Sequence, residues 1–122
     1  MKRYSIPRSR RIKAARDFAR IYEARTRAGD AHLLVYAATN AVGYPRFGVS
    51  VSRKLGPSVT RSHLKRLLRE AFRLSQHDLP NGLDLILIPQ RGRTESSQLA
   101  DFQRSLVDLS RRLAKRIGVA QT

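Results

Sequence analysis

Hydrophobic residues recur at helical spacing in three segments of the chain. The first segment runs from Ala14 to about Ala28, where Gly29 is expected to end the helix. The second runs from Val59 to Phe72, with its apolar side chains on one arc of a helix, and this helix should end before Pro80. In the third, the apolar positions step by three and four and predict a long amphipathic helix: Leu99, Phe102, Leu106, Leu109, Leu113 and Ile117.

Three further segments have the composition and spacing of β-strands. His32 to Thr39 is rich in Leu, Val and Tyr, and residues 40–45 contain the turn formers Asn, Gly and Pro. Arg46 to Lys54 alternates strictly between apolar and polar positions, which predicts a half-buried strand that pairs with the preceding one as a hairpin. The most apolar stretch, Leu83 to Ile88, predicts a buried strand closed by Pro89.

The order of these elements predicts an α+β fold, an α/β sandwich in which three helices pack on a single sheet. The order is α–β–β–α–β–α, and the pattern leaves open whether a short extra strand forms near Thr26–Arg27. Gly56-Pro57-Ser58 should break the second strand, with Ser58 as the predicted cap of the following helix. Residues 1–122 are expected to form a single domain with an irregular basic arm over residues 1–12.

The balance of charge favours a polyanionic partner. The chain has 25 Lys and Arg against 9 Asp and Glu, a formal net charge of +16, whereas solubility needs a net charge of only about 2 to 8 in a small domain. Nucleic acid is therefore the expected class of partner, and an acidic membrane surface is the weaker alternative. No apolar run is long enough to span a membrane, and the lack of cysteine agrees with a reducing cytoplasm.

The predicted second helix carries a group of cations beside its apolar arc. The group contains a row of cations spaced four residues apart, Arg61, Lys65, Arg69 and Arg73, with Arg66 beside it. No carboxylate belongs to the group. Like charges at a spacing of four repel by about 0.2–0.5 kcal/mol per pair in a helix. A bound polyanion would cancel this repulsion, and a merely solvated helix face is the alternative.

Residues that could carry catalysis are scattered along the chain. The carboxylates form no obvious metal motif, and the three histidines lack the spacing of metal ligands. His63 lies within the basic group, where it either contacts RNA or is merely exposed, whereas His32 and His77 are expected to be ordinary surface residues. No glycine-rich phosphate loop occurs. The sequence therefore predicts a binding protein with neither a catalytic site nor a metal site of its own.

A second binding surface is expected along the polar face of the strand from Arg46 to Lys54. Gly48 and two serines leave this face almost bare, so that an aromatic residue from the neighbouring strand would form the wall of a shallow trough. Small hydroxyl residues beside aromatic rings and a lysine suit single-stranded RNA, whose bases stack on such rings. The alternative is that Phe18 and Tyr22 are core residues and the serines face water. The residues expected to line the trough are Phe18, Tyr22, Tyr36, Ser50, Ser52 and Lys54.

Two segments resemble the protein subunit of bacterial ribonuclease P. They are KAARDFARIY, over residues 13–22, and FGVSVSRKLGPSVTRSHLKRLLREAFR, over residues 47–73. The family's R-N-R-x-K-R-x-x-R signature corresponds here to residues 61–69, with Ser62 and His63 in place of the signature's Asn and Arg. The resemblance extends over essentially the whole chain. It implies an α/β sandwich similar to domain 2 of ribosomal protein S5, with a left-handed crossover between parallel strands.

The resemblance also implies a function. The family assists an endonuclease that removes the 5′ leader from precursor tRNA, and catalysis resides in the RNA subunit, which also holds most of the Mg²⁺. By position, the leader would lie in the trough described above. One copy of the chain, as a monomer, would bind one ribonuclease P RNA in the bacterial cytoplasm. The residues that would bind the catalytic RNA are Arg61, Ser62, His63, Lys65, Arg66, Arg69 and Arg73.

Two other classes of protein share part of this pattern. A ribosomal or other structural RNA-binding protein could use the same basic helix without any turnover. A DNA-binding helix module could use it on duplex DNA, but duplex DNA gains nothing from a groove for a single strand.

Overall fold

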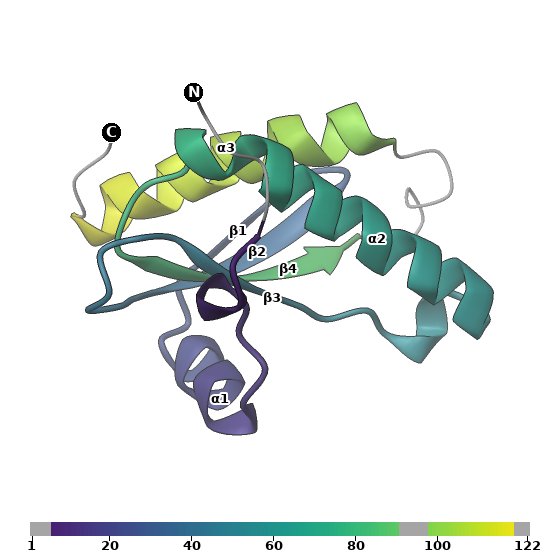
Figure 1. The fold of residues 1–122 in the computed structure, drawn as a ribbon, viewed down its shortest axis with the longest axis horizontal. Coiled ribbons are helices and arrows are strands. Elements are labelled where there is room, and N and C mark those ends of the chain that lie inside the picture. Colours follow the sequence, from purple (N-terminus) through teal and green to yellow (C-terminus); the bar gives the residue numbers. More distant parts are fainter. Residues whose placement is uncertain (1–5, 91–97, 119–122) are drawn as a thin grey trace.

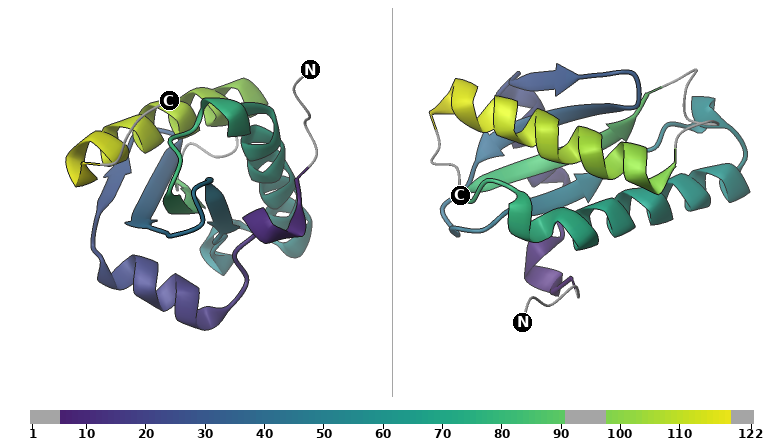
Figure 2. Two further views of the ribbon diagram at one scale, coloured as in Figure 1. Left: turned by 60° about the vertical axis from the view of Figure 1, so that its left-hand side comes forward. Right: turned by 90° about the horizontal axis from the view of Figure 1, so that it is seen from above.

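The fold consists of one four-stranded sheet with helices on both faces (Figure 1). The computed structural model of the protein describes residues 6–90 and 98–118. Two long helices, α2 and α3, lie side by side on one face of the sheet, and the short helix α1 covers part of the other face (Figure 2). The elements are α1 (Ala15–Glu23), β1 (Arg27–Gly29), β2 (Leu33–Thr39), β3 (Arg46–Val49), α2 (Ser58–Ser75), β4 (Leu83–Pro89) and α3 (Leu99–Ile117). The predicted α+β class, with a single sheet and three helices, is confirmed.

The order of the strands in the sheet is β1-β2-β4-β3, which differs from the predicted hairpin. Strand β4 lies between β2 and β3, antiparallel to the first and parallel to the second. Residues Leu83 to Leu87 of β4 are all buried. A strand of this kind is most stable in the centre of a sheet, where it has a neighbour on each edge and cover on both faces. The hairpin between β2 and β3 was therefore a wrong prediction.

Several element boundaries also differ from those predicted. The first helix ends at Glu23 rather than near Ala28, because residues Arg27–Gly29 pair with β2 as strand β1. Gly29 consequently lies in a strand and does not end a helix. The undecided extra strand does form.

The second predicted strand is shorter than its alternating pattern suggested. Strand β3 ends at Val49, and the chain then forms a 3₁₀ turn over Arg53–Leu55. The Ser52 hydroxyl accepts a hydrogen bond from the Lys54 backbone N–H (3.2 Å), a local bond that competes with strand pairing. Pro57, not Ser58, occupies the N-cap position of α2, and no side-chain hydrogen bond caps this end of the helix.

Two groups of buried residues hold the layers together. The larger lies between the sheet and the pair of long helices, where the rings of Phe47 and Phe72 stack with centroids 4.1 Å apart. The smaller group lies under α1 and consists of Ile12, Ile21, Ala38 and Ile86. Because α1 has only nine residues, this second face of the sheet is covered only in part. The exposed remainder provides a floor on which another molecule can lie.

A buried carboxylate ties α1 to the sheet. Asp84 of β4 is 0% exposed and accepts hydrogen bonds from Arg46 (Nε and Nη2, both 2.7 Å) and from Asn40 (2.8 Å). Arg20 of α1 also donates to it, and donates to the carbonyl of Thr39 as well (3.1 Å). Burial alone raises the pKa of Asp84, but hydrogen bonds from these three side chains outweigh it and hold the pKa below its ordinary value.

Candidate nucleic-acid interface

Helix α2 separates into the two faces that its sequence predicts. Leu64, Leu68, Ala71 and Phe72 are buried against the sheet and α3. The cationic face is turned outward, with Arg66 and Arg69 exposed and the remaining members of the group partly buried. The side chains that the sequence assigned to the catalytic RNA all lie on α2 and are all exposed or partly buried: Arg61, Ser62, His63, Lys65, Arg66, Arg69 and Arg73.

One carboxylate belongs to this face, contrary to the predicted all-cationic row. Glu70 accepts two hydrogen bonds from Arg73, at 2.9 Å from Nε and 2.8 Å from Nη2. The hydrogen bonds from Arg73 lower the pKa of Glu70, so the carboxylate is ionised and offsets the charge of Arg73. No described carboxylate pairs with the other four cations in this way: Arg61, Lys65, Arg66 and Arg69.

The N-terminal arm lies beside this face and adds to its charge. Arg11 forms a parallel bridge with Phe47 at the edge of the sheet, and the Ile12 backbone N–H donates to the Phe47 carbonyl (2.7 Å). The arm thereby places Arg11 across from α2. A hollow of about 390 Å³ lies between them, lined by Ile6, Arg11, Ser62, Arg66, Arg69, Glu70 and Arg73. Residues 1–5 of the predicted arm lie outside the described residues.

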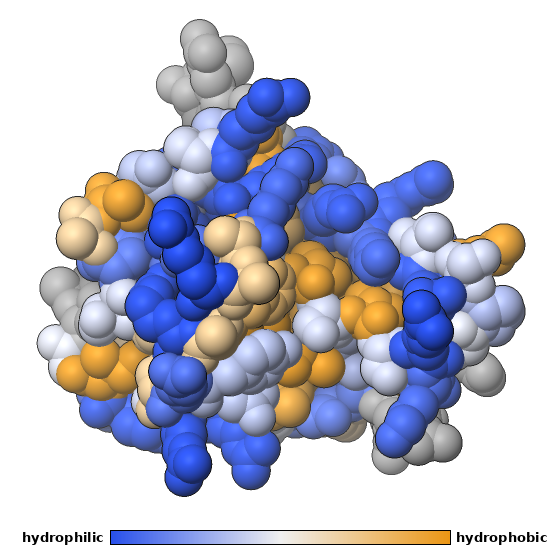
Figure 3. Space-filling model, turned by 90° about the horizontal axis from the view of Figure 1, so that it is seen from below, coloured by the Kyte–Doolittle hydropathy of each residue, from blue (hydrophilic) through white to orange (hydrophobic). Residues whose placement is uncertain are grey.

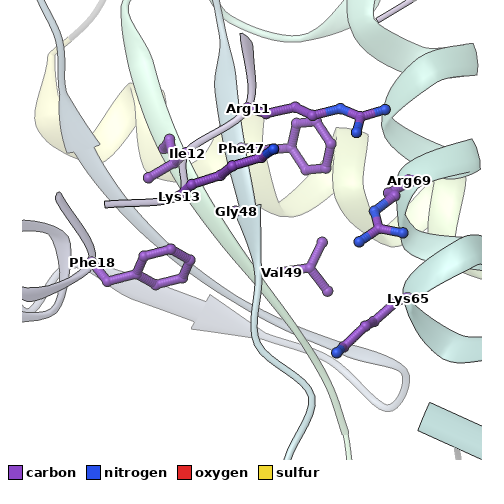
Figure 4. A pocket seen from close by; sticks show the side chains of 9 residues that line it. All are labelled: Arg11, Ile12, Lys13, Phe18, Phe47, Gly48, Val49, Lys65 and Arg69. Atoms are coloured by element: carbon purple, nitrogen blue, oxygen red, sulfur yellow. The ribbon is translucent and has the colours of Figure 1, made fainter. Parts of the chain in front are cut away.

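A second hollow, of about 280 Å³, lies between α1 and α2 over strand β3 (Figure 4). Phe18 of α1 is on one side, Lys65 and Arg69 of α2 are on the other, and Arg11 points in from the arm. Phe18 lies directly over Gly48, because a Cβ atom at that glycine would be only 2.5 Å from the Cζ atom of the ring. The hollow thus has an aromatic wall at Phe18, a cationic wall on α2, and a floor along β3 in which Gly48 lies between the side chains of Phe47 and Val49.

A third hollow, of about 370 Å³, holds the other two predicted aromatic residues. Tyr22 and Tyr36 meet edge to face with their ring centroids 4.9 Å apart, and Arg25 and Arg27 complete the lining. The trough predicted as one continuous groove is therefore represented by two hollows, one at Phe18 and one at the tyrosines.

The three remaining trough residues, Ser50, Ser52 and Lys54, line neither hollow. They follow the end of β3. The Ser50 backbone N–H donates to the Leu87 carbonyl (3.0 Å) and so prolongs the pairing with β4, and Ser52 and Lys54 are exposed. Figure 3 shows this side of the molecule from below, with apolar surface across the middle and hydrophilic side chains on both sides.

Sequence reasoning missed four cations at these hollows: Arg11, Lys13, Arg25 and Arg27. The first two lie in or next to the predicted basic arm, where the excess of positive charge was the available signal. The last two follow the true end of α1, which the sequence placed too late. Only the pairing of β1 with β2 brings them beside Tyr36.

The side chains that line these hollows are mainly cationic and aromatic. Within the described residues, no three or more His, Cys, Asp or Glu side chains gather to hold a metal ion. Guanidinium and ammonium groups bind phosphate, and exposed aromatic rings accept stacked bases. Across residues 6–90 and 98–118, no helix combines the length and apolar character needed to cross a bilayer.

Comparison with known proteins gives one consistent family. Residues 6–114 match the sequence model of the Ribonuclease P family. The chain is 34% identical to the ribonuclease P protein component of Syntrophus aciditrophicus, over 87% of this chain and 88% of that protein. It is 39% identical to that of Chromohalobacter salexigens, over 90% and 86% of the two chains.

Solved structures agree. The ribonuclease P protein of Thermotoga maritima superimposes with a TM-score of 0.76 at 30% identity, covering 84% of this chain and 96% of its own. That of Staphylococcus aureus superimposes with a TM-score of 0.71 at 31% identity, covering 90% and 96%. Both the sequence and the fold of the chain are therefore similar to those of bacterial ribonuclease P proteins.

Proposed function

The chain belongs to the bacterial ribonuclease P protein family, and on that premise we propose that it assists the endonucleolytic removal of the 5′ leader from precursor tRNA. It does so as the protein subunit of a ribonucleoprotein whose RNA subunit carries out the hydrolysis. The observation that carries this proposal is that a cationic helix face and an aromatic hollow meet at Lys65 and Arg69. Two pieces of RNA can thus be held next to each other by one small protein.

The outer face of α2 binds the catalytic RNA in this proposal. Its unpaired cations neutralise phosphates, and Ser62 and His63 add further hydrogen-bonding groups. Arg73 contributes less than its neighbours, because its charge is already offset by Glu70. One copy of the chain acts as a monomer on one RNA, in the bacterial cytoplasm.

The single-stranded leader lies across the partly covered face of the sheet. A base stacks against Phe18 while its phosphate faces Lys65 and Arg69 across the hollow. Tyr22, Tyr36, Ser50, Ser52 and Lys54 contact the leader further along its path. Mature tRNA lacks a leader, so these contacts favour substrate over product.

In this proposal the RNA subunit holds the Mg²⁺ ions. The described residues offer no cluster of carboxylates or histidines suited to a metal ion, and no step is assigned to a metal held by the chain. The contribution of the chain is electrostatic, because cations that neutralise RNA phosphates reduce the amount of Mg²⁺ that the folded RNA requires.

Adding the chain to a bacterial ribonuclease P RNA is expected to accelerate cleavage of precursor tRNA at limiting magnesium. Binding should also weaken steeply with salt, with a slope of log K against log salt of roughly −0.7 to −0.9 per phosphate contact. Single-turnover cleavage and binding measured at several salt concentrations test both statements. A structural RNA-binding protein would bind with the same salt dependence but would give no acceleration. Cleavage by the chain in the absence of RNA would contradict the assignment of catalysis.

Replacing Gly48 by alanine is expected to reduce the preference for leader-bearing tRNA over mature tRNA. The added Cβ atom would stand 2.5 Å from the Phe18 ring, whereas carbon atoms in contact are about 3.5–4.0 Å apart. The ring must therefore move away from its place above β3. Competition binding of precursor and mature tRNA to the reconstituted complex measures the effect, which we expect to be about fivefold, the low end of the contribution of one stacked base.

The matched control is the same substitution in a chain that already lacks the ring. If Gly48→Ala acts by displacing Phe18, it should have little further effect on the preference once Phe18 is leucine. An equal loss in both backgrounds would show that the methyl group acts elsewhere, and would remove Phe18 from the leader site.

A further inference from the structure

The short helix α1 is held on the sheet by few apolar contacts. Of its nine residues only Ile21 is buried, in one group with Ile12, Ala38 and Ile86. No side-chain hydrogen bond caps the start of the helix, where Ala14 is the N-cap residue. A helix that rests on one buried side chain can rotate about that contact, so other bonds must set its orientation.

Arg20 supplies these bonds. Its guanidinium donates hydrogen bonds to the carboxylate of Asp84 on β4 and to the carbonyl of Thr39 at the end of β2 (3.1 Å). The two acceptors belong to neighbouring strands, and a planar guanidinium that reaches both fixes a direction as well as a distance. Among the residues that the structure describes, no other side chain of α1 forms a hydrogen bond or an ion pair with the sheet.

Asp84 is a fixed anchor for this link. Its carboxylate is buried and also accepts two hydrogen bonds from Arg46 and one from Asn40. A carboxylate oxygen of Asp17, one turn before Arg20 on α1, lies 3.7 Å from the same guanidinium. The charge of Arg20 is thus balanced within the protein, which suits a structural link better than a contact with phosphate.

Phe18 lies on the other flank of the buried contact. At about 100° per residue, Phe18 and Arg20 are on opposite sides of Ile21, which faces the sheet. Arg20 reaches β2 and β4, whereas the Phe18 ring covers Gly48 of β3. The fit is tight, because a Cβ atom at Gly48 would be 2.5, 3.1 and 3.2 Å from three atoms of the ring. A small rotation of α1 about Ile21 would therefore lift the ring from β3 or press it into the strand.

We propose that Arg20 is a positioning residue for leader recognition, which holds α1 in the rotation at which Phe18 stands over Gly48. Arg20 lines neither the hollow at Phe18 nor the hollow at the tyrosines, and it acts through the ring rather than through a contact with RNA. The inference rests on the proposed function and deepens it, because the preference for leader-bearing tRNA then depends on a hydrogen bond outside the hollow.

The test replaces Arg20 by methionine, which keeps an aliphatic stem and removes every donor. Asp84 keeps its bonds from Arg46 and Asn40, so the variant is expected to fold. In the reconstituted ribonucleoprotein, the preference for precursor over mature tRNA should fall by about fivefold, the low end of the contribution of one stacked base. The affinities for mature tRNA and for the catalytic RNA should not change.

The matched control is Arg16→Met. Arg16 is an exposed cation one turn before Arg20 on the same helix, and it forms no hydrogen bond or ion pair with the described residues. Its replacement removes the same charge from α1 without removing a link to the sheet. The control should therefore keep the full preference for leader-bearing tRNA.

Two further measurements separate positioning from a direct contact with RNA. In a chain that carries Phe18→Leu, Arg20→Met should have little further effect on the leader preference, because both changes act through one ring. In the free protein, the amide resonance of Gly48, which lies beneath the Phe18 ring, should move in Arg20→Met toward its position in Phe18→Leu. A substitution that only lowered stability would leave this resonance in place in the folded protein.

The outcomes separate this inference from the proposed function. An equal loss of leader preference in the Phe18→Leu background, or in Arg16→Met, would assign to Arg20 a contact of charge with RNA and overturn the inference. An undiminished preference in Arg20→Met would also overturn it and leave the proposed function intact. If the wild-type complex shows no preference for leader-bearing tRNA, the proposed function itself fails.

Arg20→Lys keeps the inference testable if Arg20→Met does not fold. The ammonium group retains the charge beside Asp84 but lacks the planar pair of donors that reaches two strands. The leader preference should therefore still fall, and the Gly48 resonance should still move. A folded Arg20→Lys variant with the full preference of the wild type would overturn the inference.

Discussion

Replacing Asp84 by alanine is expected to lower the free energy of unfolding by about 3–5 kcal/mol, the usual cost of removing one partner from a buried ion pair. The carboxylate is 0% exposed and is the shared acceptor of Arg20, Arg46 and Asn40. Without it, the partly buried Arg46 guanidinium loses the carboxylate that accepts its hydrogen bonds. Domains are typically stable by about 5–15 kcal/mol, so this loss is a large fraction of the total stability.

Denaturant unfolding of the variant measures this loss. The control is Asp108→Ala on α3, which removes an ion pair with Arg112 (2.9 Å) in which both side chains are at least half exposed. Exposed pairs contribute about 0–1 kcal/mol, so this control should unfold almost as the wild type does. Equal effects of the two substitutions would show that the buried network contributes no more than a surface pair.

The pH dependence of stability provides a second measurement of the same bonds. Because the pKa of Asp84 is lower in the folded protein than its ordinary value of 3.8, the ionised carboxylate favours the folded state. The stabilisation by the ionised Asp84 is complete at pH values above its ordinary pKa. It is lost as the pH falls through the lowered pKa that Asp84 has in the folded protein. The difference in stability between the wild type and Asp84→Asn should therefore narrow on acidification, and a difference that is constant with pH would contradict the assignment.

The positions of the three helices and of β2 and β4 could be predicted because their patterns are local. The spacing of Leu99 through Ile117 determines a helical face whatever the helix packs against. The order of strands in the sheet is not local. The alternation after Arg46 indicates a half-buried strand, but the choice between β2 and β4 as its partner depends on which of them has a free edge.

The candidate site was predictable to a similar extent. The separation of α2 into a buried and a cationic face follows from its period, and Phe18, Tyr22 and Tyr36 do lie on the partly covered side of the sheet. Arg25 and Arg27 were missed because they enter the site only through the early end of α1. Asp84 had a signal that could have been used, since a charged residue inside the most apolar strand is rarely buried without a partner.

Reversing the charge at Arg66 is expected to weaken binding of the catalytic RNA by roughly thirtyfold, about the 2 kcal/mol of one charge-assisted hydrogen bond. Arg66 is exposed and, of the three hollows described above, lines the one between α2 and the arm. Arg66→Glu should therefore leave the preference for leader-bearing over mature tRNA unchanged once the complex is assembled. The loss of at least one phosphate contact should make the slope of log K against log salt shallower by roughly 0.7–0.9.

Arg69→Glu is expected to produce both defects, because Arg69 lines the hollow shared with the arm and also the hollow at Phe18. Affinity for the catalytic RNA should fall as it does for Arg66→Glu, and the leader preference should fall in addition. Binding to the RNA alone and competition between precursor and mature tRNA separate the two effects. Lys115→Glu on α3 supplies the same change of charge at an exposed position outside both hollows.

The contrast between the two reversals tests how the protein divides its contacts. The two residues are one turn apart on the same helix, so they differ little in helix propensity or in long-range electrostatics. A defect in leader preference that is confined to Arg69 therefore requires that the leader lie on the Phe18 side of α2. If Arg66→Glu reduced the leader preference as strongly, the two hollows would form one continuous binding surface for the leader. Helix α2 would then not separate the catalytic RNA from the leader.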